Sequence, residues 1–220
     1  MKVRGLLIVT LTVVLAMVGF AFWTASGAPA GAELPTHWNA AGQVDRSAPA
    51  LRALLFPPVV TLIVGLICSA VPFIEPMQDR LEASAPVMRA SWIGLLLLMI
   101  AVQLMIAAPA LGWSLSPNLL LAILGGVLMV IGNALPKSRP GFFVGIRTPW
   151  TITDTDIWIA THRLGGKLMM LVGAVFVLLA FLPLAPAIRL PIIIAGAVGS
   201  GLVPAVYSWW LWHRKARTRA

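Results

Sequence analysis

Charged side chains are scarce in this sequence. Asp, Glu, Lys and Arg make up 10% of its 220 residues, whereas hydrophobic residues make up 60%. Soluble domains carry about 25% charged residues, so the composition excludes an ordinary soluble domain and indicates an integral membrane protein. The single cysteine, Cys68, lies in an apolar run. One cysteine excludes an intramolecular disulfide and a cysteine-ligated metal site.

Acidic residues are scarcer than basic ones. Seven Asp and Glu stand against sixteen Lys and Arg, which gives a formal net charge of +9. In a soluble protein this excess would suggest nucleic-acid binding. In a membrane protein it is typical of the cytoplasmic loops. We therefore expect the basic residues to indicate which loops face the cytoplasm, and we expect no direct contact with nucleic acid.

Long uncharged runs predict six membrane-spanning helices, because a charge at the bilayer centre costs about 2.5–3.5 kcal/mol. The runs lie at residues 5–25, between Arg52 and Glu75, between Arg89 and Lys137, between Lys167 and Arg189, and between Arg189 and His213. The 89–137 run is about twice the ~20 residues that one crossing needs, and Pro109, Gly112, Trp113 and Pro117 divide it into two helices. A cleaved signal peptide is the alternative for the first run, but its apolar stretch exceeds the usual 7–15 residues. A retained anchor is favoured.

Basic residues divide unevenly between the two sides of these spans. Thirteen fall on one side, and only Arg46, Arg52 and Arg189 fall on the other. The positive-inside rule therefore places both termini in the cytoplasm, with residues 132–167 on that side and the loop 26–52 outside. Tryptophans near the span ends are expected to anchor in the membrane interface: Trp23, Trp92, Trp113, Trp209, Trp210 and Trp212.

The predicted fold class is all-α: a polytopic membrane protein with six transmembrane helices, cytoplasmic termini and one short amphipathic interfacial helix in the fourth loop. Residues 1–75 form the first unit, which holds the outer loop 26–52. Residues 90–220 form a four-helix unit, which holds the polar segment 132–167. No loop reaches the ~40 residues below which domains seldom fold alone, so no separate soluble domain is expected.

The polar segment, residues 132–167, is the longest interruption of the apolar chain. Its first half contains three prolines, each of which keeps the preceding residue out of the helical region, so an extended path is expected. Thr153 and Asp156 have the spacing of a capping box, with Asp in the usual Glu place. We predict a short helix over residues 154–164, lying along the membrane and closed by Gly165. Its charges are also compatible with a simple solvated face against anionic lipid.

The outer loop offers a second set of polar residues. His37, Asn39 and Asp45 are close enough in sequence to form a polar site, and Asn39 with Gly42 supplies turn chemistry. The simpler interpretation is a structured turn whose polar side chains bond their own backbone. Both interpretations stay open at this point.

These two loops resemble a known family. The stretch GNALPKSRPGFFVGIRTPWTITDTDIWIATHRLGGKL closely resembles the signature of the SdpI family, and LPTHWNAAGQVD resembles the short domain of unknown function that commonly precedes it. Proteins of that family give bacteria immunity to the sporulation-delaying toxin peptide. The positions that agree with the signature are Asn133, Pro136, Gly145, Arg147, Thr148, Pro149, Trp150, Trp158, His162, Arg163, Gly165, Gly166 and Lys167.

The resemblance implies a multi-pass protein of the bacterial cell membrane, bound to the lipid bilayer, that protects against a secreted peptide toxin. The founding member of the family is also a sensor that holds a small winged-helix repressor at the membrane, so the resemblance implies such a partner as well. Peptide contact is then expected at His37, Asn39, Gly42 and Asp45. Contact with the cytoplasmic partner is expected at Arg147, Thr148, Trp150, Trp158, His162, Arg163 and Lys167.

A membrane enzyme and a transporter are the alternatives. His37 and His162 lie on opposite sides of the predicted membrane, and the sequence has no His-Glu-x-x-His motif. We therefore expect no catalytic site, no metal and no cofactor. A small-solute or ion transporter would need ionisable groups inside the spans, where the sequence offers little beyond Gln103 and Cys68. Gln103 is expected to form an interhelical hydrogen bond.

Overall fold

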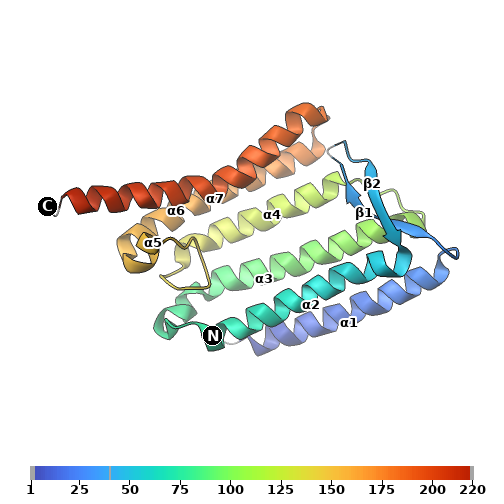
Figure 1. Ribbon diagram of the computed structural model, residues 1–220, viewed down its shortest axis with the longest axis horizontal. Helices are drawn as coiled ribbons and strands as arrows, with labels where there is room; N and C mark the ends of the chain where they lie inside the picture. The colour runs from blue at the N-terminus through green and yellow to red at the C-terminus, as the bar shows by residue number, and fades with distance from the viewer. Residues whose placement is uncertain (1–2, 40, 219–220) are drawn as a thin grey trace.

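Six long helices lie side by side in chain order in the computed structural model, which describes residues 3–39 and 41–218 (Figure 1). All six are long and apolar enough to cross a membrane. They are α1 (Arg4–Gly27), α2 (Ala50–Ile74), α3 (Gln78–Ala107), α4 (Asn118–Ala134), α6 (Thr155–Phe181) and α7 (Pro186–Arg217). The prediction of a polytopic helical membrane protein is confirmed.

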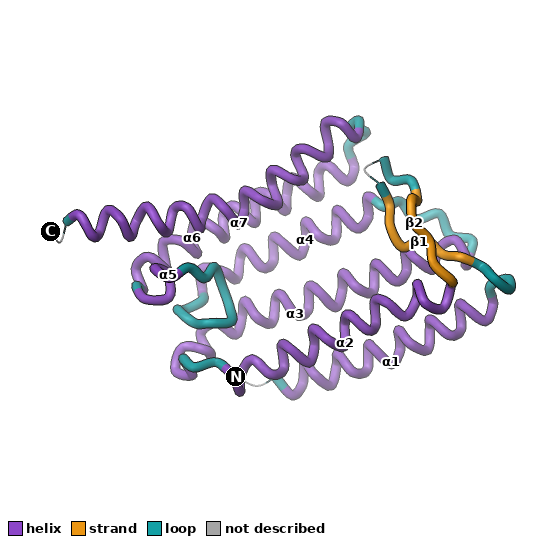
Figure 2. The backbone as a smooth tube through the Cα atoms, in the orientation of Figure 1, coloured by secondary structure: helices purple, strands orange, loops and turns teal. Residues whose placement is uncertain are grey.

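Shorter elements cover the two ends of this bundle (Figure 2). At one end, β1 (Glu33–Trp38) and β2 (Val44–Pro49) form an antiparallel hairpin near the short helix η1 (Ala108–Leu111). The opposite end holds η2 (Leu135–Lys137), α5 (Pro149–Thr153), the start of α1 and the end of α7. We call these the hairpin end and the loop end. The sequence predicted a turn at the hairpin end but neither of the two strands.

The predicted interfacial helix over residues 154–164 is wrong. α6 begins at Thr155 and continues through Gly165 to Phe181, so the predicted segment is the first part of a membrane-spanning helix. Gly165 does not end a helix. A Cβ atom there would lie 2.5 Å from Cδ1 of Ile146, so any larger residue would displace this loop side chain.

Glycines also bring α4 and α6 into backbone contact. A Cβ on Gly125 would lie 2.5 Å from the carbonyl oxygen of Gly173, and one on Gly132 would lie 2.7 Å from that of Gly166. Each pair is seven residues from the other along both helices, so the two contacts lie about 10 Å apart on the same helix faces. Small residues of this kind let membrane helices approach closely. α4 and α6 accordingly pack together more extensively than any other pair of elements.

Two buried polar side chains join the first three helices. Nε2 of Gln103 on α3 donates to the carbonyl oxygens of Met17 at 2.8 Å and Leu54 at 3.0 Å, which confirms the predicted interhelical hydrogen bond. The indole of Trp92 donates to Oγ1 of Thr10 at 2.9 Å. Trp92 is only 1% exposed, so its predicted place among the interfacial tryptophans is wrong. Its N–H requires a buried acceptor, which α1 supplies.

Candidate functional site

The loop end is built around His162, on the second turn of α6. Nε2 of His162 accepts a hydrogen bond from the backbone N–H of Ile146 at 2.8 Å, and Nδ1 lies 2.7 Å from the carbonyl oxygen of Trp158. Because Nε2 accepts, Nδ1 carries the proton and donates to that carbonyl. The imidazole stacks on the Trp158 indole with centroids 4.0 Å apart. Both residues are fully buried, so the ring pair is an internal support for the loop.

Gly145 closes over this ring pair. Its φ of +115° lies in a region that side chains rarely adopt, and a Cβ atom would overlap His162 and approach Trp158 to 2.8 Å. Glycine is therefore required here for both its backbone conformation and its size. The loop, the imidazole and the indole form one close-packed unit.

Two serines fasten the part of the loop that precedes Gly145. The indole N–H of Trp158 donates to Oγ of Ser138 at 3.1 Å, and that hydroxyl donates to the carbonyl oxygen of Leu135 at 2.9 Å. Ser84 on α3 makes two bonds with the backbone of Arg139: Oγ accepts from its N–H at 3.1 Å and donates to its carbonyl oxygen at 3.2 Å. The loop is thus bonded to α3 as well as to α6.

Glu75, at the C-terminal end of α2, holds the next stretch of loop. Its carboxylate accepts hydrogen bonds from the backbone N–H groups of Phe142, at 3.0 Å, and Phe143, at 3.1 Å, and from that of Met77 at 3.0 Å. The side chain is only 3% exposed. A carboxylate is disfavoured at a helix C-terminus by the helix dipole, so these three donors stabilise it in an otherwise unfavourable place.

The sequence analysis missed Glu75. One signal was present: an acidic residue stands immediately after an uncharged run, at the end of a helix where a basic residue is preferred. Its partners are backbone groups 67 and 68 residues away. Backbone donors leave no mark in a sequence, so the contact itself could not be predicted.

The second half of the loop is bonded to α7. Thr148 caps α5 in a capping box with Thr151, and its Oγ1 lies 3.2 Å from Oγ of Ser208. The indole N–H of Trp150 also donates to Ser208. The Trp150 ring packs near Trp212, with centroids 6.1 Å apart. α5 therefore docks its one large aromatic side chain against the last helix.

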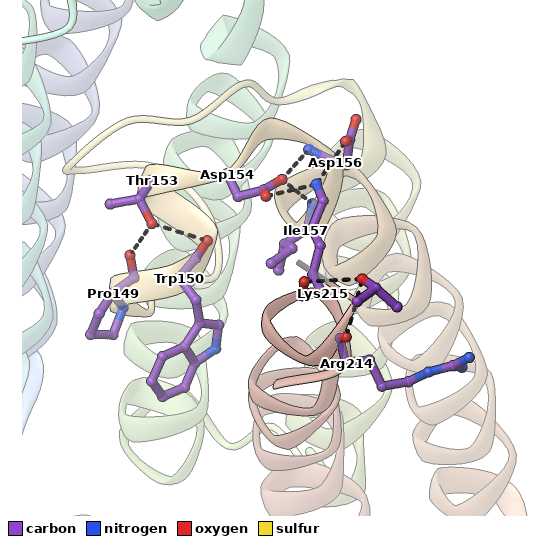
Figure 3. Close-up of polar contacts among 9 residues, drawn as sticks. Pro149, Trp150, Thr153, Asp154, Asp156, Ile157, Arg214 and Lys215 are labelled. Atoms are coloured by element: carbon purple, nitrogen blue, oxygen red, sulfur yellow. Dashed lines mark hydrogen bonds and ion pairs between the residues drawn. The ribbon is translucent and has the colours of Figure 1, made fainter. Parts of the chain in front are cut away.

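An acidic pair at the start of α6 binds the end of α7 (Figure 3). Asp154 is the N-cap of α6, one residue after the predicted Thr153, and accepts from the N–H groups of Asp156 and Ile157. Nζ of Lys215 lies 2.7 Å from Asp154 and 2.9 Å from Asp156. Partial burial alone would raise the pKa of the Asp154 carboxyl, but the hydrogen bonds from Lys215 and the two N–H groups outweigh it and lower that pKa.

The seven residues predicted to contact a cytoplasmic partner fall into two groups. Trp158 and His162 on α6 are fully buried beneath the loop and cannot contact a partner directly. Thr148 and Trp150 are partly buried. Arg147, Arg163 and Lys167 are exposed. The Arg147 guanidinium donates to the carbonyl oxygen of Phe142 at 2.6 Å, which places it beside Phe142 and Phe143, two exposed aromatic side chains.

The four outer-loop candidates all belong to the hairpin. Nδ1 of His37 on β1 lies 2.5 Å from Oδ1 of Asp45 on β2. Oδ1 of Asn39 accepts from the N–H groups of Ala41 and Gln43, and Gly42 has a φ of +79°. Asn39 and Gly42 therefore build the turn, as the simpler interpretation predicted, whereas His37 and Asp45 form an exposed cross-strand pair.

Two half-open grooves flank the hairpin. One, of about 400 Å³, lies toward α4 and α7 and includes Asn118 and Arg189 in its lining. The other, of about 470 Å³, lies toward α2 and α3 and includes Arg46 and Arg52. Over residues 3–39 and 41–218, no group of three or more His, Cys, Asp or Glu side chains is placed to hold a metal ion.

Comparison with known proteins finds similarity to a family over most of the part of the chain that forms this site. The sequence pattern of the SdpI/YfhL protein family matches residues 137–208, and that of the domain of unknown function DUF1648 matches residues 10–62. The resemblance to the SdpI family is confirmed. The matched region begins at the end of η2 and contains His162, its contacts with Ile146 and Trp158, and the Ser208 contact on α7, whereas Ser84 and Glu75 lie outside it.

A curated relative shows the same resemblance. The chain is 27% identical over 88 residues to the immunity protein SdpI of Bacillus subtilis (strain 168). The match covers 40% of this chain and 42% of that relative, so it spans less than half of either protein. No solved structure matches this chain.

Proposed function

We propose that this chain is a membrane immunity protein that protects a bacterial cell against a secreted, membrane-active peptide. The observation that carries the proposal is the SdpI-family region, residues 137–208, together with the similarity to the immunity protein SdpI of Bacillus subtilis. On this proposal the hairpin end faces outward and meets the peptide. The loop end, with both termini, lies in the cytoplasm, in agreement with the basic residues there.

The exposed part of the loop end is the proposed surface for a cytoplasmic partner. Arg147 lies beside two exposed phenylalanines, and Arg163 and Lys167 are exposed on the following helix. Arginine and aromatic side chains contribute most of the binding energy at many protein interfaces. The partner that the family suggests is a small winged-helix repressor. Trp158 and His162 would act on this surface from inside, by fixing the shape of the loop.

The immunity proposal is tested by challenging cells with a sporulation-delaying type of peptide. Cells with and without the protein are compared for membrane depolarisation, followed with a potential-sensitive dye. The protein is expected to delay depolarisation. Equal depolarisation at verified membrane levels of the protein would contradict the proposal for this peptide class.

The partner surface is tested separately with Arg147→Ala. Arg217→Ala is the matched control, because Arg217 is an exposed arginine at the same end but outside the proposed surface. A winged-helix regulator encoded beside this gene, when one is present, should sediment with wild-type and Arg217→Ala membranes in the presence of the peptide. Sedimentation should be lost with Arg147→Ala. Equal sedimentation with both variants would remove Arg147 from the mechanism while leaving the immunity proposal intact.

A further inference from the structure

The groove between the hairpin, α2 and α3 has a charged mouth and an apolar interior. Its volume is about 470 Å³. Arg46 and Ser47 on β2 and Arg52 in the first turn of α2 supply donors, whereas Phe56, Val102 and Ile106 supply apolar surface. None of the described residues that line it is acidic.

Among the residues that the structure describes, both arginines of this groove are without an ion-pair partner. Neither the Arg46 nor the Arg52 guanidinium forms an ion pair or a side-chain hydrogen bond with any described residue. The nearby Asp45 carboxylate is already bonded to His37. Two guanidinium groups at one groove, neither paired with a described carboxylate, favour an anion from outside the protein.

The position of each lining residue along the helices indicates which kind of anion fits the groove. Arg46 lies on β2, which leads directly into α2 (Figure 1), and Arg52 lies in the first turn of α2. Phe56 is four residues further along α2, about 6 Å deeper toward the middle of the bundle. α3 runs in the opposite direction, so Val102 lies about one turn deeper than Ile106. Positive charge at the membrane surface therefore leads directly into apolar surface at hydrocarbon depth.

We propose that this groove binds an anionic phospholipid of the leaflet at the hairpin end. The lipid phosphate would lie between the Arg46 and Arg52 guanidinium groups, and an acyl chain would lie along Phe56 and Val102. Basic sites between membrane helices bind acidic lipid head groups in this way. A free phosphate makes no favourable contact with the apolar wall. A zwitterionic lipid carries no net charge, so two arginines stabilise it less than an acidic lipid. The charge and depth pattern together select an acidic lipid.

The test uses the purified full-length protein in detergent and native mass spectrometry of bound lipid. Phosphatidylglycerol and phosphatidylcholine with identical acyl chains are added in competition. Each arginine near a lipid surface is worth about a fivefold preference for an acidic lipid, so the wild-type protein should retain phosphatidylglycerol on the order of tenfold or more over phosphatidylcholine. The double variant Arg46→Gln/Arg52→Gln should lose that preference.

The matched control removes the same charge at the other end of the bundle. Arg80 and Arg89 are both exposed at the loop end, and Arg80→Gln/Arg89→Gln should keep the preference for phosphatidylglycerol. Equal loss in both double variants would overturn the proposal, because it would show a response to net charge alone. Competition by glycerol phosphate at the same concentration would also overturn it, because the site would then be one for a free anion.

A photo-crosslinking residue in place of Phe56 gives a second measurement in membranes. An adduct with the mass of an acidic phospholipid is expected in the wild-type background, and it should disappear with Arg46→Gln/Arg52→Gln. If adding a membrane-active peptide gives a peptide adduct in place of the lipid adduct at sub-stoichiometric peptide, the groove is a peptide site and the lipid proposal is wrong. Phe56 is exposed, so this substitution should not disturb folding.

Discussion

Removing the Glu75 carboxylate should release the loop residues that it holds. Two remote backbone N–H groups, those of Phe142 and Phe143, depend on this side chain. In Glu75→Ala they lose their acceptor, and no other described acceptor bonds to them. Glu75→Gln keeps one oxygen but turns an amide NH₂ group toward the remaining donors, so it should have an intermediate effect.

The expected magnitude follows from the type of bond. A hydrogen bond to a charged group contributes about 1.5–3 kcal/mol, so two such bonds stabilise the closed loop by about 3 kcal/mol at the lower end of that range. Water bonds the freed groups once the loop opens, which favours the lower figure. A loss of about 3 kcal/mol corresponds to roughly a 100-fold increase in the open population.

Hydrogen exchange measures this local opening without requiring global unfolding. In Glu75→Ala, the amides of Phe142 and Phe143 should exchange roughly 100-fold faster than in the wild-type protein. Amides of the hairpin should exchange at unchanged rates. Glu33→Ala, which removes an exposed carboxylate at the opposite end, should leave both regions unchanged. Unaltered exchange at Phe142 and Phe143 in Glu75→Ala would refute the role of this carboxylate.

Three further predictions concern packing, backbone conformation and pH. Gly125→Ala should lower the melting temperature because its Cβ would overlap a backbone carbonyl of α6, whereas Gly126→Ala, which faces open space, should be neutral or stabilising by about 0.5–1 kcal/mol; equal effects in thermal melts would contradict the close contact. Gly145→Ala should cost at least about 2 kcal/mol through its positive φ and its overlap with His162, or roughly 4–8 °C in melting temperature. Because its pKa is lowered in the folded protein, the Asp154 carboxylate stabilises the fold at pH values above its unfolded pKa of about 3.8, and this contribution is lost as the pH falls through the folded pKa. Asp154→Asn should therefore make the free energy of unfolding depend less on pH below about pH 4. Parallel pH curves for the two proteins would contradict this role of Asp154.

The membrane-spanning helices could be predicted because charge is excluded from the bilayer. Uncharged runs located all six, and the break near Pro109 and Pro117 was placed correctly. The start of α6 was misjudged for a related reason. The capping spacing of Thr153 and Asp156, with Gly165 as an expected end, predicted a separate surface helix, but α6 continues through Gly165, and Arg163 and Lys167 are exposed in the first half of that continuous span. Charges one to three turns from a helix end reach the interface by extending their side chains.

The loop end could be predicted only in part. The resemblance to the SdpI family selected Gly145, Trp158 and His162 as important, but their burial against each other depends on how α6 meets the loop. The sequence therefore indicated which residues matter without indicating whether they face a partner or the interior. Glu75 lies outside the signature and binds backbone groups, so neither residue type nor spacing pointed to it.

α2 joins the two ends of the molecule without an intervening linker. β2 ends at Pro49 and α2 begins at Ala50, while Glu75 directly follows the last residue of the same helix. A shift of the hairpin along the bundle axis would therefore be transmitted by α2, about 37 Å long, to the Glu75 carboxylate that holds the loop at the opposite end. On the proposed function, an event at one membrane surface would then reach the other through the position of α2 alone.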